Sequence, residues 1–142
     1  MSYNILGINP GHNGSACLVS DGELKYYLEE ERLSRMKYDG NPFKSMIDIM
    51  SKYHVDELVI VGTYPDHPTL PWTMEDVYTG LVRKYYPEVK TTILGQEHHL
   101  THASIAFYNS GFKKAVAVIV DDPLVAANTT PLVEVALIGF IS

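Results

Sequence analysis

Two turn motifs near the start of the chain place the strongest constraint on what it can fold into. A glycine-rich turn occupies residues 10–14 (PGHNG), and an Asp-Gly turn occupies residues 21–22. They separate three segments with strand patterns, at 3–9, 15–20 and 23–30, and the third alternates apolar and polar residues. Because tight turns join neighbouring strands in opposite directions, these segments predict an antiparallel three-stranded meander.

The rest of the chain alternates helical and strand patterns. The predicted elements are a helix from 41 to 53, a strand at 58–62, a helix from 73 to 86, a strand at 91–94, a helix at 96–108, a strand at 115–120 and an edge strand at 132–138. Asn41 and Pro42 suit the N-cap and first position of the first helix, and Thr73 with Asp76 suits a capping box in the second. Three prolines make 63–72 a loop. The sequence therefore predicts an α/β fold with a mixed sheet, in which a meander is followed by helical crossovers.

Helical spacing also predicts which side chains face the core. In the first helix these are Phe43, Met46, Ile47, Met50 and Tyr53. In the second they are Met74, Val77, Tyr78, Leu81 and Tyr85. In the third, the small residues Ala103 and Ala106 would let the helix approach the sheet closely.

Charge and composition exclude several classes of partner. The chain has 11 Lys and Arg against 17 Asp and Glu, a net charge of −6, so it lacks the basic surface that nucleic acids require. It has neither a Lys/Arg cluster for an anionic membrane nor an apolar run long enough to span one. A lone cysteine, Cys17, and an amino terminus without a signal-peptide pattern fit a cytoplasmic protein. We expect no nucleic acid and no membrane as partner.

Histidines cluster at the start of the third predicted helix, and an aspartate ends the following strand. His98 and His102 are four residues apart, so on a helix they share one face and can ligate one divalent metal. Asp121 follows an apolar strand, where α/β folds place site residues. Two histidines and one carboxylate can form a metal site with open positions. The alternatives are a solvated histidine cluster and an ordinary strand-ending aspartate.

Two further segments could hold an anion. The turn at 10–14 could offer backbone N–H groups, to which His12 and Ser15 add donors, although a plain hairpin turn explains the same residues. Arg32, Arg35 and Lys37 could bind phosphate or carboxylate groups. The alternative for these three is a solvated charged segment between elements.

Taken together, four motifs resemble a known family. The segments are GINPGHNGSACLVSDGEL, EEERLSRMKYDGNPF, HHLTHASIAFYNSGF and AVIVD, in that order between about residues 3 and 121. They are similar to the amino-terminal part of the carbamoyltransferases of the nodulation and antibiotic O-carbamoylation type. The resemblance implies the first lobe of an actin-like and sugar-kinase-like ATPase fold, built on a ribonuclease-H-like sheet.

The resemblance also implies an activity and a set of site residues. The family uses carbamoyl phosphate and ATP, forms a carbamoyl-adenylate and transfers the carbamoyl group to a hydroxyl-bearing small molecule. It binds a divalent metal, often iron, with manganese or zinc as alternatives. By resemblance, the ligands here are His98, His102 and Asp121. The catalytic residues are His12, Arg35 and Lys37, and the residues that bind ATP or carbamoyl phosphate are Gly11, Asn13, Ser15 and Arg32.

Three departures qualify what carries over. The family usually has Asp where this chain has Asn13, which can hydrogen-bond but cannot act as a base. Its strand-end motif is usually Asp-Gly, whereas here Asp121 precedes Asp122 and Pro123. The resemblance ends there, so we expect residues 1–122 to form the first lobe and 123–142 an unrelated apolar tail. The missing second lobe would supply the adenine pocket, so activity would need a partner chain. The alternative is a non-catalytic module that binds metal or an anion.

Overall fold

The computed structural model describes residues 2–61, 71–95, 98–121 and 134–141. The chain divides into two compact units, residues 1–96 and 97–142, and each is described by itself.

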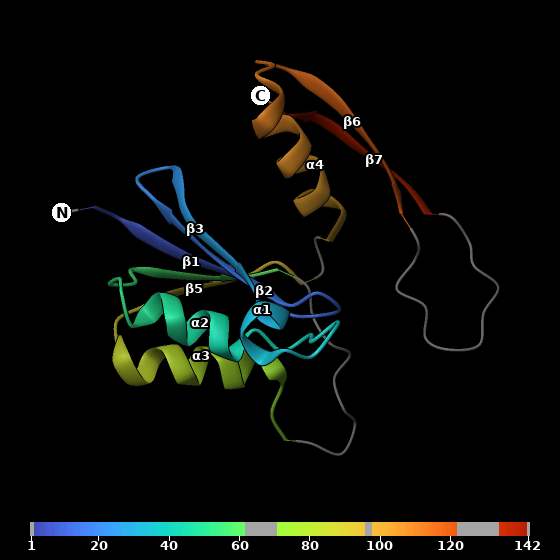
Figure 1. The fold of residues 1–142 in the computed structure, drawn as a ribbon. Helices are drawn as coiled ribbons and strands as arrows, with labels where there is room; N and C mark the ends of the chain where they lie inside the picture. Colours follow the sequence, from blue (N-terminus) through green and yellow to red (C-terminus); the bar gives the residue numbers. More distant parts are fainter. Residues whose placement is uncertain (1, 62–70, 96–97, 122–133, 142) are drawn as a thin grey trace. The chain divides into compact units, whose positions relative to one another are not determined.

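A five-stranded mixed sheet forms the centre of the first unit (Figure 1). Its strands are β1 (Asn4–Asn9), β2 (Ser15–Ser20), β3 (Glu23–Glu29), β4 (Glu57–Ile60) and β5 (Lys90–Ile93). Their order in the sheet is β3-β2-β1-β4-β5. The first three strands pair antiparallel, while β4 is parallel to β1 and β5 is parallel to β4. The predicted meander and the mixed α/β class are confirmed.

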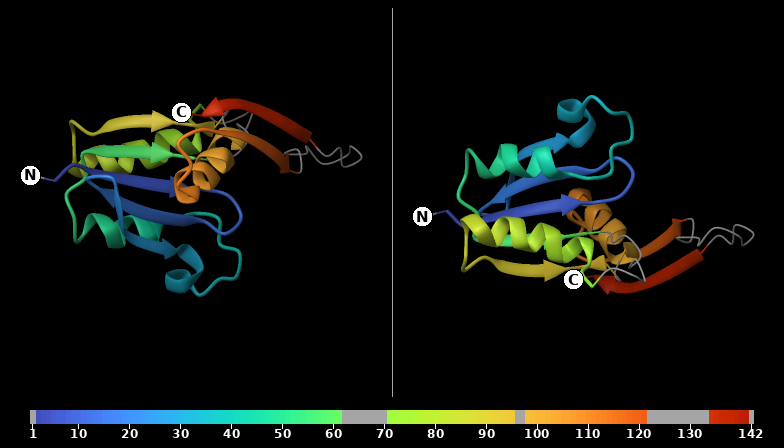
Figure 2. Two further views of the ribbon diagram at one scale, coloured as in Figure 1. Left: turned by 90° about the horizontal axis from the view of Figure 1, so that it is seen from above. Right: turned by 90° about the horizontal axis from the view of Figure 1, so that it is seen from below.

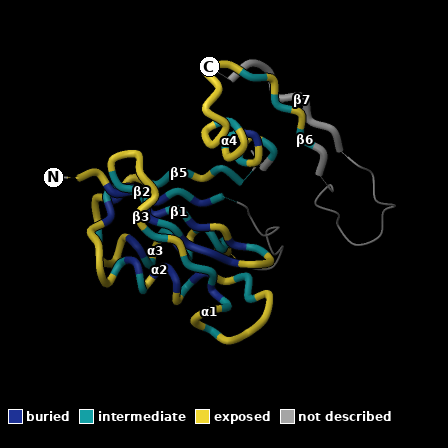
Figure 3. Tube along the Cα trace, turned by 45° about the horizontal axis from the view of Figure 1, so that its top comes forward, coloured by how far each residue is buried: buried dark blue, intermediate teal, exposed yellow. Residues whose placement is uncertain are grey.

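Two helices of the first unit cover one face of this sheet. They are α2 (Phe43–Met50) and α3 (Met74–Tyr85), which lie side by side in Figures 1 and 2. The core between helices and sheet is made of buried apolar residues, and Figure 3 colours the buried residues of the trace dark blue. They include Leu6, Ile8, Leu18, Leu58 and Ile60 from the strands, Met46 and Ile49 from α2, and Tyr78 and Val82 from α3. The crossover helices therefore bury the apolar face of the strands, as the pattern predicted.

The buried face of α2 differs from the prediction. Tyr53 is 38% exposed and lies beyond α2, which ends at Met50. Within the helix, Ile47 is 51% exposed, whereas Ile49 is fully buried. The cause is Ser45, a buried residue that binds the carboxylate of Glu30. Because that contact turns Ser45 inward, the buried stripe includes 45, 46 and 49, and Ile47 lies outside it.

The ends of α2 and α3 also refine the prediction. In α2 the N-cap is Pro42, not Asn41, and the helix begins at Phe43. In α3 the predicted capping box is confirmed: Thr73 accepts a hydrogen bond from the Asp76 amide, and the Asp76 side chain accepts one from the Thr73 amide. Tyr85, predicted to face the core, is 62% exposed because it lies in the last turn, and Val82 is buried instead.

A short helix, α1 (Glu30–Ser34), was not predicted. It follows β3 directly, within the segment that the sequence presents as densely charged. Arg35 ends it in the left-handed conformation with φ 62°. The helix has only five residues, little more than one turn, so no apolar periodicity can develop in its sequence.

The second unit contains a helix and a two-stranded antiparallel sheet. Its elements are α4 (His98–Ser110), β6 (Ala115–Asp121) and β7 (Glu134–Ile141). The strands pair from Ala115↔Ile141 to Asp121↔Glu134, and α4 contacts both of them. The tail thus supplies a strand near the predicted position, while the limits 1–122 and 123–142 stay a prediction. Ala103 is fully buried, but Ala106 is exposed.

None of the helices in the described ranges is long and apolar enough to cross a membrane.

Candidate functional site

The loop at residues 10–14 lies at the carboxyl end of β1. Because β1 and β4 are parallel, their carboxyl ends meet at one edge of the sheet, the edge where α/β folds gather functional groups. Gly11 and Asn13 have φ angles of 127° and 63°, so the loop uses left-handed conformations that Gly and Asn adopt most readily. His12 and Asn13 are exposed, whereas Gly14 and Ser15 are buried. The loop therefore presents His12 and Asn13 to solvent.

Backbone hydrogen bonds join this loop to the segment 36–41. The Gly11 amide donates to the Gly40 carbonyl at 3.0 Å, and the Gly14 amide donates to the Asp39 carbonyl at 2.9 Å. A Cβ on Gly14 would lie 2.7 Å from the carbonyl carbon of Gly40, so only glycine allows this approach. Two amides that the sequence suggested for anion binding are thus used internally. The amides of His12 and Asn13 make no backbone hydrogen bond to another described residue.

Glu30 connects the loop to α2. Its amide donates to the Gly14 carbonyl at 2.8 Å, and its side chain is 2% exposed. One carboxylate oxygen accepts from the Lys44 amide at 3.1 Å. The other accepts from the Ser45 amide at 2.8 Å and lies 2.8 Å from the Ser45 hydroxyl. This residue therefore satisfies the first amides of α2 and places a negative charge at the positive end of its dipole.

Sequence reasoning missed Glu30. It stands between Glu29 and Glu31, and three adjacent glutamates have the same chemistry, so nothing in the pattern distinguishes the buried one. The one feature of the sequence that could have indicated a buried acidic partner is Ser45, which stands next to the apolar residues of α2. A serine there can be buried only if a polar partner meets it.

The basic residues lie on α1 and just beyond it, and all three are exposed. The Arg32 guanidinium lies 3.4 Å from a Glu29 carboxylate oxygen and 3.9 Å from one of Glu31. The Lys37 ammonium lies 4.8 Å from the centre of the Tyr38 ring. Lys37 thus belongs to the segment that contacts the loop, whereas Arg32 is directed to its neighbouring glutamates. An anion at Arg32 would compete with these solvent-exposed ion pairs, which cost little to break.

The predicted metal ligands belong to the second unit. His98 and His102 are one turn apart on α4, and Asp121 is the last residue of β6. The short connection at 111–114 makes β6 run back along α4, which brings the end of β6 toward the start of the helix (Figure 1). His102 is exposed, and the side chains of His98 and Asp121 lie outside the described part of the structure.

The predicted set of donor atoms is one that suits a divalent metal. Two imidazoles and one carboxylate are a donor set that iron, manganese and zinc accept. Within the described side chains, no group of three His, Cys, Asp or Glu residues is placed to hold a metal ion. Because the side chains of two of the three predicted ligands lie outside the described part of the structure, the metal site stays a prediction.

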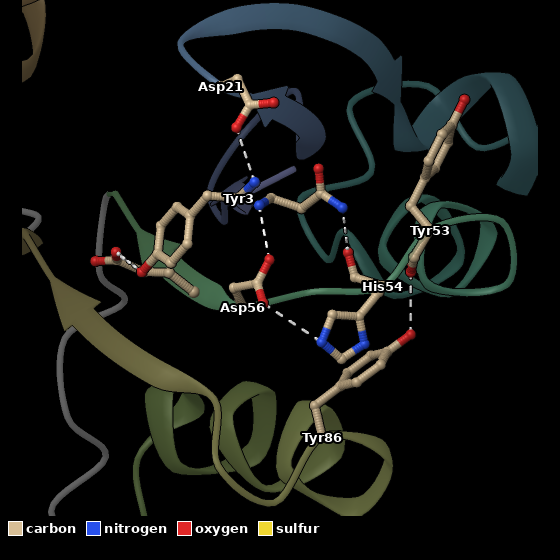
Figure 4. Close-up of polar contacts among 8 residues, drawn as sticks. Tyr3, Asp21, Tyr53, His54, Asp56 and Tyr86 are labelled. Atoms are coloured by element: carbon tan, nitrogen blue, oxygen red, sulfur yellow. Dashed lines mark hydrogen bonds and ion pairs between the residues drawn. The ribbon is translucent and has the colours of Figure 1, made fainter. Parts of the chain in front are cut away.

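The opposite edge of the first sheet has a different character. A cavity of about 260 Å³ lies there, bordered by His54, Asp56 and Tyr86 among other residues. Three of its polar side chains, those of His54, Asp56 and Tyr86, have partners (Figure 4): Asp56 accepts from the Asn4 amide at 2.8 Å and lies 3.4 Å from the His54 imidazole. The Tyr86 hydroxyl lies 3.0 Å from the Tyr53 carbonyl, and burial raises the pKa of Tyr86. These groups bind one another, so this edge is structural.

Glu57, at the start of β4, binds three side chains across the sheet at this structural edge. Its carboxylate lies 3.0 Å from the Lys90 ammonium and accepts hydrogen bonds from the hydroxyls of Thr92 and Tyr3, each at 2.9 Å. Despite the opposing effect of burial, these contacts, the one with Lys90 above all, lower the pKa of Glu57. The residue stabilises the pairing of β1, β4 and β5.

Comparison with known proteins finds partial relatives of this chain. An uncharacterized protein of Methanocaldococcus jannaschii is 30% identical over 121 residues, which cover 82% of this chain and 22% of that protein. The nodulation protein NolNO of Sinorhizobium fredii is 29% identical over 133 residues, which cover 78% of this chain and 19% of that protein. The chain thus spans about a fifth of the length of the curated relatives it matches. No protein-family model matches the chain, and no solved structure does.

Proposed function

We propose that this chain is the amino-terminal lobe of a carbamoyltransferase of the nodulation and antibiotic O-carbamoylation type. The observation that carries the proposal is the similarity to nodulation protein NolNO over 78% of the chain, in agreement with the four ordered motifs. The strand order β3-β2-β1-β4-β5 supports the ribonuclease-H-like lobe, because its antiparallel meander continues into parallel strands joined by helical crossovers.

In this proposal the loop at 10–14 binds the phosphate side of the substrate. The amides of His12 and Asn13 and the His12 imidazole are donors for the oxygens of carbamoyl phosphate or ATP. Arg35 and Lys37 supply positive charge from the neighbouring segment. Gly11, Ser15 and Arg32 complete the site, Gly11 by shaping the turn. Such a reaction depends on positioning and charge stabilisation more than on a protein nucleophile.

The metal belongs to the second unit in this proposal. His98, His102 and Asp121 hold a divalent ion, with iron first and manganese or zinc as alternatives. When bound, such an ion polarises phosphoryl or carbamoyl oxygens. The one-turn spacing of His98 and His102 on α4 would place both imidazoles on one side of the helix, where they would hold the ion together with Asp121.

The complete reaction needs more than the residues present here. We propose that carbamoyl phosphate and ATP are the substrates, that a hydroxyl-bearing small molecule is the acceptor, and that a second lobe supplies the adenine pocket. That lobe could belong to a partner chain. A cytoplasmic location is part of the proposal. The competing function is a non-catalytic module that binds an anion or a metal.

The test measures phosphate release from carbamoyl phosphate with ATP and ferrous iron, together with binding of carbamoyl phosphate by calorimetry. The variants are His12→Ala and His102→Ala. His54→Ala is the matched control, because His54 is also exposed but lies at the structural edge of the sheet.

We expect the wild type to bind carbamoyl phosphate and His12→Ala to weaken that binding. We expect His102→Ala to lower the iron content. His54→Ala should equal the wild type in both measurements. Phosphate release that His102→Ala abolishes would exclude the non-catalytic module, whereas binding alone is the result that either function gives in the absence of the second lobe. If the wild type binds neither carbamoyl phosphate nor iron, both functions are wrong.

A further inference from the structure

Glu30 combines two contacts that no other described carboxylate combines. Through its amide it holds the Gly14 carbonyl of the loop, at 2.8 Å. Through its carboxylate it binds the first amides of α2, at Lys44 and Ser45. The side chain is 2% exposed, so these bonds form away from water, where hydrogen bonds to a charged group are strong.

The contacts of Glu30 determine where an anion can bind. The amino terminus of α2 is a ready-made anion site, and the Glu30 carboxylate already occupies it. An external phosphate group is therefore excluded from the amino terminus of α2, and the loop at 10–14 with its basic neighbours is the nearby place where donors remain.

The loop in turn depends on the residues around Glu30. Gly14 is bound on one side by the Glu30 amide and on the other by the Asp39 carbonyl. Because Glu30 is anchored to α2, and the segment 36–41 leads directly into α2, the loop is connected to the same rigid helix by both routes. If the Glu30 carboxylate did not bind the Lys44 and Ser45 amides, the loop would keep only its connection through the segment 36–41.

We propose that Glu30 is a positioning residue for the anion site: its carboxylate, anchored on α2, fixes the loop at 10–14 in the form that binds phosphate. This inference rests on the proposed function for the identity of the ligand. The positioning itself is a property of the loop and can be measured without a ligand.

The test uses the full chain with Glu30→Gln. Glutamine has the shape of glutamate, but its amide group is a donor, so it cannot accept from Lys44, Ser45 and the Ser45 hydroxyl as the carboxylate does. Glu57→Gln is the matched control, since Glu57 is also a buried carboxylate with three hydrogen-bonding partners, at the opposite edge of the sheet. Ser45→Ala removes only the hydroxyl that donates to the Glu30 carboxylate. This milder variant replaces Glu30→Gln in both measurements if Glu30→Gln does not fold.

Two quantities are measured at a temperature where every variant is folded. The first is amide hydrogen exchange at Gly11 and Gly14, the donors to Gly40 and Asp39. We expect Glu30→Gln to speed this exchange by about tenfold or more, the order expected when a buried charged hydrogen bond is lost, and Glu57→Gln to leave it unchanged. The second is the affinity for inorganic phosphate and for carbamoyl phosphate, which we expect Glu30→Gln to weaken by about tenfold and Glu57→Gln to preserve.

The outcomes separate the two proposals. If wild type binds neither anion, the proposed function is wrong, and the exchange at Gly11 and Gly14 alone decides the role of Glu30. If exchange in Glu30→Gln equals that of wild type, or if Glu57→Gln speeds it equally, Glu30 only stabilises the fold and the inference is wrong. If exchange rises but an existing affinity stays unchanged, Glu30 orders the loop without serving the site, which also contradicts it.

Discussion

Gly14→Ala tests the close contact between the loop at 10–14 and the segment 36–41. A Cβ at position 14 would lie 2.7 Å from the Gly40 carbonyl carbon and 2.9 Å from the carbonyl oxygens of Asp39 and Gly40. Real Cβ atoms do not approach other atoms so closely, and the obstructing atoms are backbone, which cannot rotate away. The segment must therefore move.

The cost can be worked out from two contributions. Overpacking of this kind costs about 1–3 kcal/mol. Moving the segment also lengthens the 2.9 Å hydrogen bond from the Gly14 amide to the Asp39 carbonyl, which contributes about 0.5–1.5 kcal/mol. Together these give a loss of about 2–4 kcal/mol. At about 4 °C per kcal/mol for a chain of this size, the unfolding midpoint should fall by roughly 8–16 °C.

The assay is thermal unfolding followed by circular dichroism, with Gly80→Ala as the control. Gly80 lies in α3, and a Cβ there would meet no atom within 4 Å, so alanine should stabilise the helix by about 0.5–1 kcal/mol. The reasoning is refuted if Gly14→Ala unfolds within about 2 °C of wild type, because the predicted displacement would then cost almost nothing.

Three further predictions concern other parts of the first unit. Gly7→Ala places a Cβ 2.9 Å from the Cys17 sulfur, so it should cost about 1–2 kcal/mol, and adding Cys17→Ala should recover most of this in urea unfolding; additive losses would contradict it. Thr73→Ala removes the capping box of α3 and should cost about 1 kcal/mol by the same assay, whereas an unchanged midpoint would show that the cap contributes nothing. Because contacts led by Lys90 lower the pKa of Glu57, its contribution is fully present above its ordinary pKa of about 4.5 and is lost as pH falls through the lowered value. The stability difference between wild type and Glu57→Gln should therefore shrink between pH 7 and about pH 3, and a constant difference would be inconsistent with this.

The fold was predictable where local chemistry decides it. Tight turns at 10–14 and 21–22 have few solutions, and the meander follows from them. Continuous apolar runs predicted the strands near 58–62 and 115–120. The first of these strands is largely buried, as expected, whereas Val116 and Val118 of the second are exposed, so burial was predicted correctly only for β4. The positions of Ile47 and Ile49 were not predictable, because a contact from a distant carboxylate rotates the buried stripe of α2.

The candidate site was predictable only in part. His12 and Asn13 could be identified because the Gly and Asn residues around them are typical of a turn at a strand end, and the structure places both on an exposed loop. The burial of Glu30 and the internal use of the Gly11 and Gly14 amides could not be predicted. Both depend on how residues far apart in the sequence meet in space, and local pattern contains no information on that pairing.

The two edges of the first sheet differ in whether their polar groups remain able to bind a ligand, and this difference favours a site at the carboxyl end of β1. At the edge where β1, β4 and β5 begin, Asp56 and Glu57 are bound by neighbouring groups, so a ligand would have to displace existing bonds. At the edge where β1 ends, buried bonds to Glu30 hold the backbone of the loop, but the exposed His12 and Asn13 amides make no backbone bond within the described chain. A binding site needs rigid support beneath donors that still have capacity to bind, and within the first unit the loop at 10–14 combines both.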